Sequence, residues 1–328
     1  MSAPANYRPN SPRPLRRWIP LAALLLAIAP TQLHAGAWTQ SPGGMYFKLA
    51  GLSFRSQDYL DAVGERRERV AKPSMEELSD ESMSAYLEYG LHEHLTLVAT
   101  LPYKRLVYKN TEVKVFKSDL LDTTITRIHP DEINSGLADL ELRLRWRLLR
   151  NPAVVSLALG GKFPLGYDMN QDSIGSLDAG GLGLGPSPVD DGAGADNKVP
   201  LGTGERDVDM RLLVGKSLYP LPGYLTGTVG YRKRGGAFSD EFFYGFEAGV
   251  TYNRLLVKGV IEGMRTMGDC GTMGQGGLVG DQDILKVAPG LIWSLSKHLE
   301  IGVDLFHIAA GCNTAAGTTY AAGLAFKR

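Results

Sequence analysis

The chain has 328 residues, with 35 Lys and Arg against 35 Asp and Glu, and this zero net charge argues against a nucleic-acid partner held by bulk basicity. Hydrophobic residues make up 44% of the chain and aromatic residues 9%, whereas Gly reaches 40 residues. A glycine-rich chain with short alternating segments suits turns and closely spaced strands better than helices.

The first 35 residues have the order of a secretory signal peptide. In chain order the features are Arg13, Arg16 and Arg17, an apolar run over residues 18–30, and the small residues Ala35, Gly36 and Ala37. The apolar run is shorter than the roughly 20 residues that a membrane-spanning helix needs. We therefore expect export, with residues 1–35 removed by cleavage after Ala35; cleavage after Ala37 is the alternative.

Period-two alternation predicts twelve strands in the mature chain, residues 36–328. They lie near residues 45–55, 82–90, 95–108, 136–149, 154–166, 206–218, 224–234, 242–253, 255–267, 284–295, 299–309 and 318–327. Most of them reach the roughly 9–11 residues that a tilted strand needs to cross a bilayer. No apolar run after the signal segment is long enough for a spanning helix, so membrane residence would require strands.

The segment DLELRLRWRL, residues 139–148, carries a charge at every second position. A helix turns about 100° per residue and would scatter these charges around its cylinder, whereas a strand puts them all on one face. In a membrane barrel the leucines and Trp146 would face lipid and the charges would face the lumen. The predicted luminal charges are Asp139, Glu141, Arg143, Arg145, Arg147, Asp207, Asp209, Arg211, Arg232, Arg234 and Glu247.

The predicted connections alternate between long and short along the chain. The mostly long set is 56–81, 109–135, 167–205, 235–241, 268–283 and 310–317, and the short set is 91–94, 151–153, 219–223, 253–254 and 296–298. Outer-membrane barrels have short periplasmic turns and longer external loops, and an even strand number puts both termini on the periplasmic side. The pattern therefore predicts an all-β, single-domain, twelve-stranded transmembrane antiparallel barrel; a soluble sandwich is the alternative.

Three local features refine this prediction. Residues 168–205 are rich in Gly and Asp and would form a long external loop. Ser74 and Glu77 have capping-box spacing, which predicts a short helix at 75–79 within the first loop. Prolines at 102, 164 and 289 would mark bulges or breaks in the strand ladder.

Cys270 and Cys312 are the two cysteines of the chain. An even count in an exported protein predicts a disulfide, here between the fifth and sixth external loops, with free thiols as the alternative.

No metal site, cofactor or catalytic constellation is expected. Asp168, Asn170 and Asp172 have the opening spacing of a calcium loop, but the glycine and the closing Glu of such a loop are missing. His92 and His94 lack a third zinc ligand in sequence. Ser296 and His298 flank a short turn, away from any external site, so an enzyme is not expected; an outer-membrane barrel hydrolase is the alternative.

Five segments resemble those of one known family. They are YGLHEHLTL (89–97), GLADLEL (136–142), GKFPLG (161–166), LGTGERDV (201–208) and GYRKRGG (230–236). They resemble the outer-membrane channel family named after the meta-cleavage pathway of phenol degradation. The resemblance implies an outer-membrane barrel of a Gram-negative bacterium and a transporter of small organic compounds, with no catalytic residues. The chain departs from the usual barrel ending, because Lys327 and Arg328 follow the terminal aromatic Phe326.

The luminal charges have two interpretations. They would sort solutes by charge at a constriction, or they would form a salt-bridged network that braces a narrow barrel. We expect an outer-membrane channel for passive transport of small solutes, including small organic or aromatic compounds, gated partly by residues 168–205. A non-conducting structural or surface-binding barrel is the alternative. The expected partners are outer-membrane lipids, lipopolysaccharide, small-molecule solutes and the barrel assembly machinery, without nucleic acid.

Overall fold

The computed structural model describes residues 36–69, 74–117, 122–128, 131–167, 201–270 and 281–328. The predicted signal peptide and most of the predicted 168–205 loop lie outside these ranges. The described residues belong to one unit, and no helix among them is long and apolar enough to cross a membrane.

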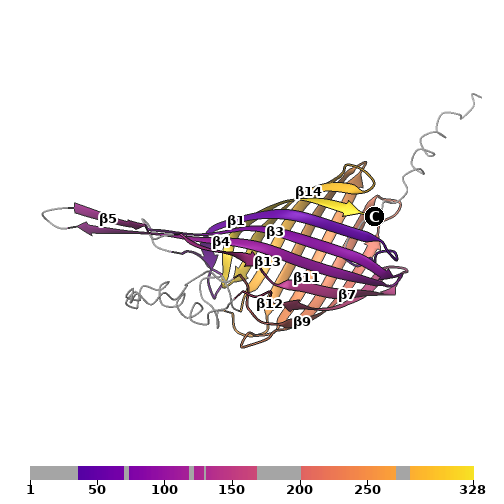
Figure 1. The fold of residues 1–328 in the computed structure, drawn as a ribbon, viewed down its shortest axis with the longest axis horizontal. Helices are drawn as coiled ribbons and strands as arrows, with labels where there is room; N and C mark the ends of the chain where they lie inside the picture. The colour runs from indigo at the N-terminus through magenta and orange to yellow at the C-terminus, as the bar shows by residue number, and fades with distance from the viewer. Residues whose placement is uncertain (1–35, 70–73, 118–121, 129–130, 168–200, 271–280) are drawn as a thin grey trace, which may run out of the picture. The chain divides into compact units, whose positions relative to one another are not determined.

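The described chain forms fifteen strands (Figure 1). They are β1 (Met45–Leu60), β2 (Arg66–Glu68), β3 (Met75–His92), β4 (Leu95–Lys117), β5 (Asp122–Ile128), β6 (Glu132–Leu137), β7 (Leu140–Leu149), β8 (Val154–Phe163), β9 (Asp207–Ser217), β10 (Gly223–Lys233), β11 (Glu241–Tyr252), β12 (Leu255–Thr266), β13 (Asp283–Ser294), β14 (Leu299–Cys312) and β15 (Thr314–Lys327). Twelve of them form the barrel wall, in which each strand pairs antiparallel with its neighbours and β15 pairs with β1 to close the sheet. The predicted twelve-stranded antiparallel barrel is confirmed.

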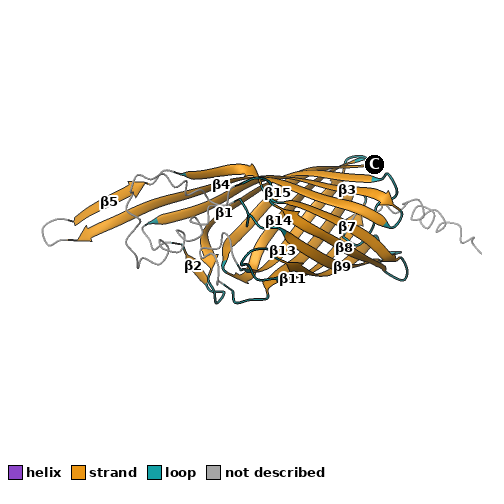
Figure 2. Ribbon diagram, turned by 60° about the horizontal axis from the view of Figure 1, so that its bottom comes forward, coloured by secondary structure: helices purple, strands orange, loops and turns teal. Residues whose placement is uncertain are grey.

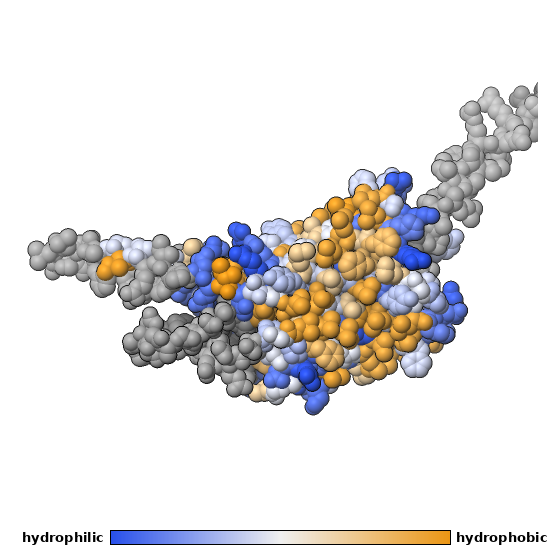
Figure 3. Space-filling model, in the orientation of Figure 1, coloured by the Kyte–Doolittle hydropathy of each residue, from blue (hydrophilic) through white to orange (hydrophobic). Residues whose placement is uncertain are grey.

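The side chains of the wall alternate as predicted between an apolar outer face and a polar inner face. On β7, Leu144 and Trp146 are exposed on the outside, whereas Arg145 between them is buried on the inside. On the face shown in Figure 3, apolar side chains cover the middle of the barrel as a broad band, with polar residues toward its two ends. An apolar band of this kind matches the hydrocarbon layer that such barrels span.

The five short connections lie at one end of the barrel, together with the carboxyl terminus. They are residues 93–94, 150–153, 218–222, 253–254 and 295–298. Asn253 begins the two-residue turn at a positive φ of 54°, a conformation that Asn adopts more readily than most residues. We call this the short-turn end and the opposite one the long-loop end.

Several expected loops are strand instead. The helix predicted at 75–79 is wrong, because β3 already begins at Met75. The Ser74 hydroxyl accepts a hydrogen bond from the Val113 N–H of β4, 2.9 Å away, so it serves a strand edge rather than a helix cap. The 310–317 loop is also wrong, because β14 continues along β13 as far as Cys312 and β15 starts along β1 at Thr314.

The connection predicted at 109–135 contains most of a β-ribbon. β4 runs on to Lys117 and pairs with β5 over residues 111–117, and this ribbon extends beyond the barrel wall (Figures 1 and 2). β6 pairs with β4 nearer the barrel. Hydrogen bonds between neighbouring strands satisfy the backbone without a membrane or a core, which is why a polar segment can continue as strand there.

The prolines mark interruptions of pairing, as expected for residues without an N–H. Pro102 on β4 lies opposite the break between β6 and β7, where its carbonyl accepts the Ala138 N–H at 3.0 Å. Pro289 pairs with Gly259 on one side, whereas the ladder to β14 is interrupted at its position. Pro164 directly follows the end of β8.

Candidate functional site: the charged barrel lumen

The middle of the lumen holds a compact group of ion pairs. Arg143 of β7 contacts Asp209 of β9 with two nitrogens, at 2.9 and 3.0 Å, and Glu141 at 2.8 Å. Arg211 contacts the same Asp209 at 3.1 Å. The Asp209 side chain is fully buried, so its charge depends on these guanidinium groups for compensation.

The group continues along β10 and β11. Arg232 lies 3.5 Å from Glu141 and 3.4 Å from Glu241, and Arg234 lies 3.1 Å from Glu241. Arg234 also contacts Asp281, at 3.3 Å, in the connection between β12 and β13. Because Asp209, Glu141 and Glu241 are each shared between two or more arginines, the cluster is a network in which removal of one member leaves another uncompensated.

A second cluster lies toward the long-loop end. Lys162 of β8 bridges Asp139 and Asp207, each at 3.1 Å. The Tyr167 hydroxyl donates to Asp139, and burial together with this hydrogen bond raises the pKa of Tyr167. Leu201 is buried beside Ala138, so the described ends of the long middle loop pack inside the barrel wall.

Residues 36–41, which we call the amino-terminal segment, lie inside the lumen at the short-turn end. Arg145 donates to the Trp38 carbonyl at 2.9 Å and contacts Glu88 at 3.1 Å. Arg147 donates to the Thr39 hydroxyl at 3.1 Å. The two arginines predicted to line a filter therefore hold a piece of the chain itself.

Between these clusters is a cavity of about 420 Å³. Its lining includes Gly36 of the amino-terminal segment and the luminal residues Glu141, Arg211, Thr226, Thr228, Arg232, Phe243, Glu247, Glu262 and Lys286. The guanidinium groups of Arg211 and Arg232 lie 4.7 and 4.6 Å from the centre of the Phe243 ring, close enough for cation–π attraction. The cavity thus offers charge of both signs and an aromatic surface.

The structure brings most of the predicted luminal charges into these clusters. Glu247 lies apart from them and accepts a hydrogen bond from the Tyr224 hydroxyl at 2.5 Å. Sequence reasoning missed Glu88, Lys162, Glu241 and Asp304, of which Asp304 bridges Lys48 and Lys258 at 3.2 and 3.1 Å. Glu88, Lys162 and Asp304 follow the same alternation along their strands and could have been found by it.

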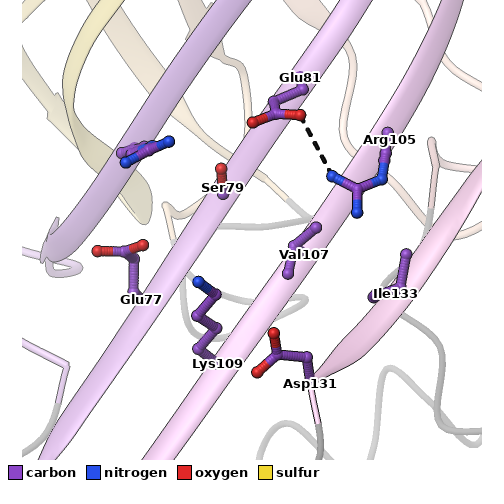
Figure 4. A pocket seen from close by; sticks show the side chains of 9 residues that line it. Glu77, Ser79, Glu81, Arg105, Val107, Lys109, Asp131 and Ile133 are labelled. Carbon is purple, nitrogen blue, oxygen red and sulfur yellow. Dashed lines mark hydrogen bonds and ion pairs between the residues drawn. The ribbon is translucent and has the colours of Figure 1, made fainter.

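A smaller pocket of about 130 Å³ lies on β1, β3 and β4 near the long-loop end (Figure 4). Glu81 and Arg105 pair across it at 3.2 Å, with Lys109 and Asp131 nearby. Glu81 lies two residues from the exposed Met83 on β3, and Arg105 lies two residues from the exposed Tyr103 on β4. Because side chains two apart on a strand share a face, this pair lies on the outer face, on the long-loop side of the apolar band. Exposed ion pairs of this kind contribute little energy and do not define a ligand.

Cys270 and Cys312 form a disulfide, with their Cα atoms 6.2 Å apart. Cys312 lies at the end of β14 rather than in a loop. The rings of His92 and His94 lie 5.9 Å apart at the short-turn end, where Arg147 contacts His94.

Comparison with known proteins shows similarity of fold to solved structures but does not show a family. No family model matches the chain, and no curated protein matches it. An outer membrane channel from Pseudomonas putida F1 is similar in structure, with a TM-score of 0.59 over 90% of this chain and 100% of that chain, at 10% identity. The Ralstonia pickettii toluene transporter TbuX has a TM-score of 0.41, covers 90% of this chain and 95% of that chain, and is 8% identical. The described chain has the fold of an outer-membrane barrel.

Proposed function

We propose that this chain is an outer-membrane channel through which small solutes pass by diffusion. The observation that carries the proposal is the polar, charge-lined cavity enclosed by a closed barrel whose outer face is apolar. A wall of this kind places a water-compatible interior across a bilayer. The fold shared with the Pseudomonas putida channel supports the same function.

The cavity lining supports small organic solutes, including aromatic ones, as the transported class. Phe243 offers a ring surface, and Arg211 and Arg232 beside it offer hydrogen-bond donors and positive charge. Glu141 and Glu247 supply acceptors on the same lining. A phenol-like molecule, with one apolar body and one polar group, would find both kinds of contact there, in line with the family that the sequence resembles.

The paired charges favour a fixed lining over a mobile one. Asp209 and Glu141 each contact more than one arginine, so these ion pairs restrict the guanidinium groups to fixed positions in the lumen. The bracing and filtering roles that the sequence left as alternatives are therefore compatible: the network stabilises the barrel, and its cavity-facing members set the local charge.

Planar-bilayer recording of the purified mature protein tests the proposal. Steady single-channel steps with a reversal potential in a salt gradient are expected. Folding is verified by heat-modifiable gel mobility. Folded barrels that carry no current would overturn the proposed channel and favour a structural or surface-binding barrel.

Outer-membrane location, after removal of residues 1–35, belongs to the same proposal. It is tested by fractionation of the producing cell: the mature protein is expected in the outer-membrane fraction and resistant to extraction by salt. Recovery in the soluble periplasmic fraction would contradict it.

A further inference from the structure

The short-turn end of the barrel carries four exposed cations that have no ion pair with any described residue. Each belongs to a different hairpin: Arg150 to β7–β8, Lys216 to β9–β10, Arg254 to β11–β12 and Lys297 to β13–β14. These four hairpins follow one another in the wall and supply eight of its twelve strands. The four side chains, which we call the basic rim, are therefore spread around most of the short-turn end.

Acidic residues are scarce at the same end. Glu93, between β3 and β4, is the single carboxylate side chain in the five short connections, and the connections that carry the basic rim hold none. Glu300, near the start of β14, is already paired with Lys327 at 2.5 Å. The terminal carboxylate offsets the side-chain charge of Arg328, so Arg328 is not counted in the rim. The basic rim thus remains a set of uncompensated positive charges.

Exposed arginines at the long-loop end, by contrast, have acidic partners. The pairs are Arg66–Asp58 at 2.6 Å, Arg67–Asp61 at 3.0 Å, Arg105–Glu81 at 3.2 Å and Arg265–Asp283 at 3.4 Å. Both ends are exposed and rich in charge, yet the described cations of one end are paired and those of the rim are not. The excess of positive charge is therefore particular to the short-turn end.

The basic rim lies at the edge of the apolar outer surface. Lys216 lies two residues beyond the exposed Val214 on β9, so both side chains point outward. Trp293, 53% exposed, pairs with Leu255, the residue directly after Arg254. Outward-facing tryptophan is typical of the depth at which the hydrocarbon layer meets the headgroups. Lysine and arginine side chains just beyond this depth can extend to headgroup phosphates.

We propose that the basic rim binds the anionic headgroups of phospholipids in the leaflet that surrounds the short-turn end. This inference goes beyond the proposed channel and rests on the proposed outer-membrane location, in which the short turns face the periplasm. Basic side chains beside a membrane are attracted to anionic lipids. Cations distributed over eight strands match a ring of surrounding lipids, whereas one acidic protein would favour a compact patch.

Quenching of tryptophan fluorescence by brominated phospholipid tests the proposal on the folded mature protein. Trp146 and Trp293 are exposed on the outer face near the rim and report on the lipids that contact it. The protein is reconstituted into vesicles of phosphatidylglycerol and phosphatidylcholine in equal amounts, with bromine on one lipid or on the other. Both leaflets have the same composition, so the result does not depend on the direction of insertion. Trp38 in the lumen adds the same background to every form.

Two variants with equal loss of charge separate the rim from the net charge of the protein. The rim variant carries Arg150→Gln, Lys216→Gln, Arg254→Gln and Lys297→Gln. The control variant neutralises four exposed cations at the long-loop end and carries Arg66→Gln, Arg67→Gln, Arg105→Gln and Arg265→Gln. Heat-modifiable gel mobility first verifies that each form is folded.

Brominated phosphatidylglycerol is expected to quench the wild type severalfold more strongly than brominated phosphatidylcholine, and high salt should reduce the difference. The rim variant should lose this difference and the control variant should retain it. Equal quenching by the two lipids in the wild type would overturn the proposal and favour an acidic periplasmic partner for the rim. A difference that persists in the rim variant, or that disappears in both variants, would also overturn it. None of these results depends on conductance, so the channel can fail or stand separately.

Discussion

At the scale of single residues, Arg211 is the luminal cation best placed to act on a passing solute. It lines the central cavity, and its described ion pair goes to Asp209, a carboxylate that Arg143 already holds with two nitrogens. Its charge is therefore compensated less completely than that of Arg143. Arg145 and Arg147, which the sequence placed in the same filter, are occupied by the amino-terminal segment.

Arg211→Gln is expected to shift the reversal potential in a salt gradient toward cations, because it removes positive charge from the cavity and retains a hydrogen-bonding side chain. Lys297→Gln, in the exposed turn between β13 and β14, is the matched control and should leave the potential unchanged. Identical potentials in Arg211→Gln and wild type, both folded, would exclude Arg211 from ion selection.

Asp240, in the connection between β10 and β11, allows a prediction on pH. The hydrogen bond from the Tyr231 hydroxyl, followed by one from the Arg234 N–H, holds the pKa of Asp240 below its ordinary 3.8. Because the pKa of Asp240 is lower in the folded protein than in the unfolded chain, its ionised carboxylate stabilises the folded connection at a pH above 3.8. This stabilisation is lost as the pH falls through the pKa that Asp240 has in the folded protein. Tyr231→Phe should raise the pKa of Asp240 toward 3.8, measured by an NMR titration of its carboxyl carbon. An unchanged titration curve would show that the hydrogen bond is not formed.

At the scale of elements, the strict alternation of β7 fixes its register in the wall. Arg143 and Arg145 face inward, whereas Leu144 faces outward with 46% of its surface exposed. A shift by one residue would put arginines into lipid and leucines into the lumen.

Substitution on the outer face of β7 should therefore depend on depth. Leu144→Arg, near the middle of the strand, is expected to lower the free energy of unfolding in lipid vesicles by about 2–4 kcal/mol. Leu148→Arg, near the short-turn end, should cost about 0–1 kcal/mol because the charge can reach the interface. Denaturant titration of both variants in vesicles measures this, and equal costs at the two positions would contradict the assigned membrane depth.

The disulfide ties the connection after β12 to the end of β14. Because Cys270 and Cys312 are bonded, alkylation of the exported protein under denaturing conditions without reductant should add no mass. The same treatment after reduction should add two labels. Two labels without reductant would show that both thiols are free.

The interiors of the strands could be predicted from sequence and their outer ends could not. Within the bilayer, lipid on one side and a polar lumen on the other impose a strict period, which is visible in β7 and β9. Beyond the bilayer both faces meet water, so the period fades. The sequence therefore predicts loops for β3 before residue 82 and for β4 after residue 108, where the structure has strand. There the backbone hydrogen bonds between neighbours maintain the strand, and they leave no pattern in side-chain polarity.

At the scale of the whole molecule, the barrel encloses a lumen into which two parts of its own chain pack, one toward each end. Leu201 packs against the wall toward the long-loop end, and Ala37 and Trp38 pack at the short-turn end. The charge-lined cavity lies between them. The presence of luminal charges followed from alternation alone, but their partners did not, because pairing depends on strand order and register. The position of residues 36–41 in the lumen could not be predicted, because these residues form no strand and show no alternation of polar and apolar side chains.

Single-channel recording in a salt gradient, with the folded wild-type barrel beside Arg211→Gln, shows whether this barrel conducts. Steady steps with a non-zero reversal potential are expected from both proteins, with the potential of Arg211→Gln shifted toward cations. Silence from both proteins, each shown to be folded, would contradict the claim that this barrel conducts.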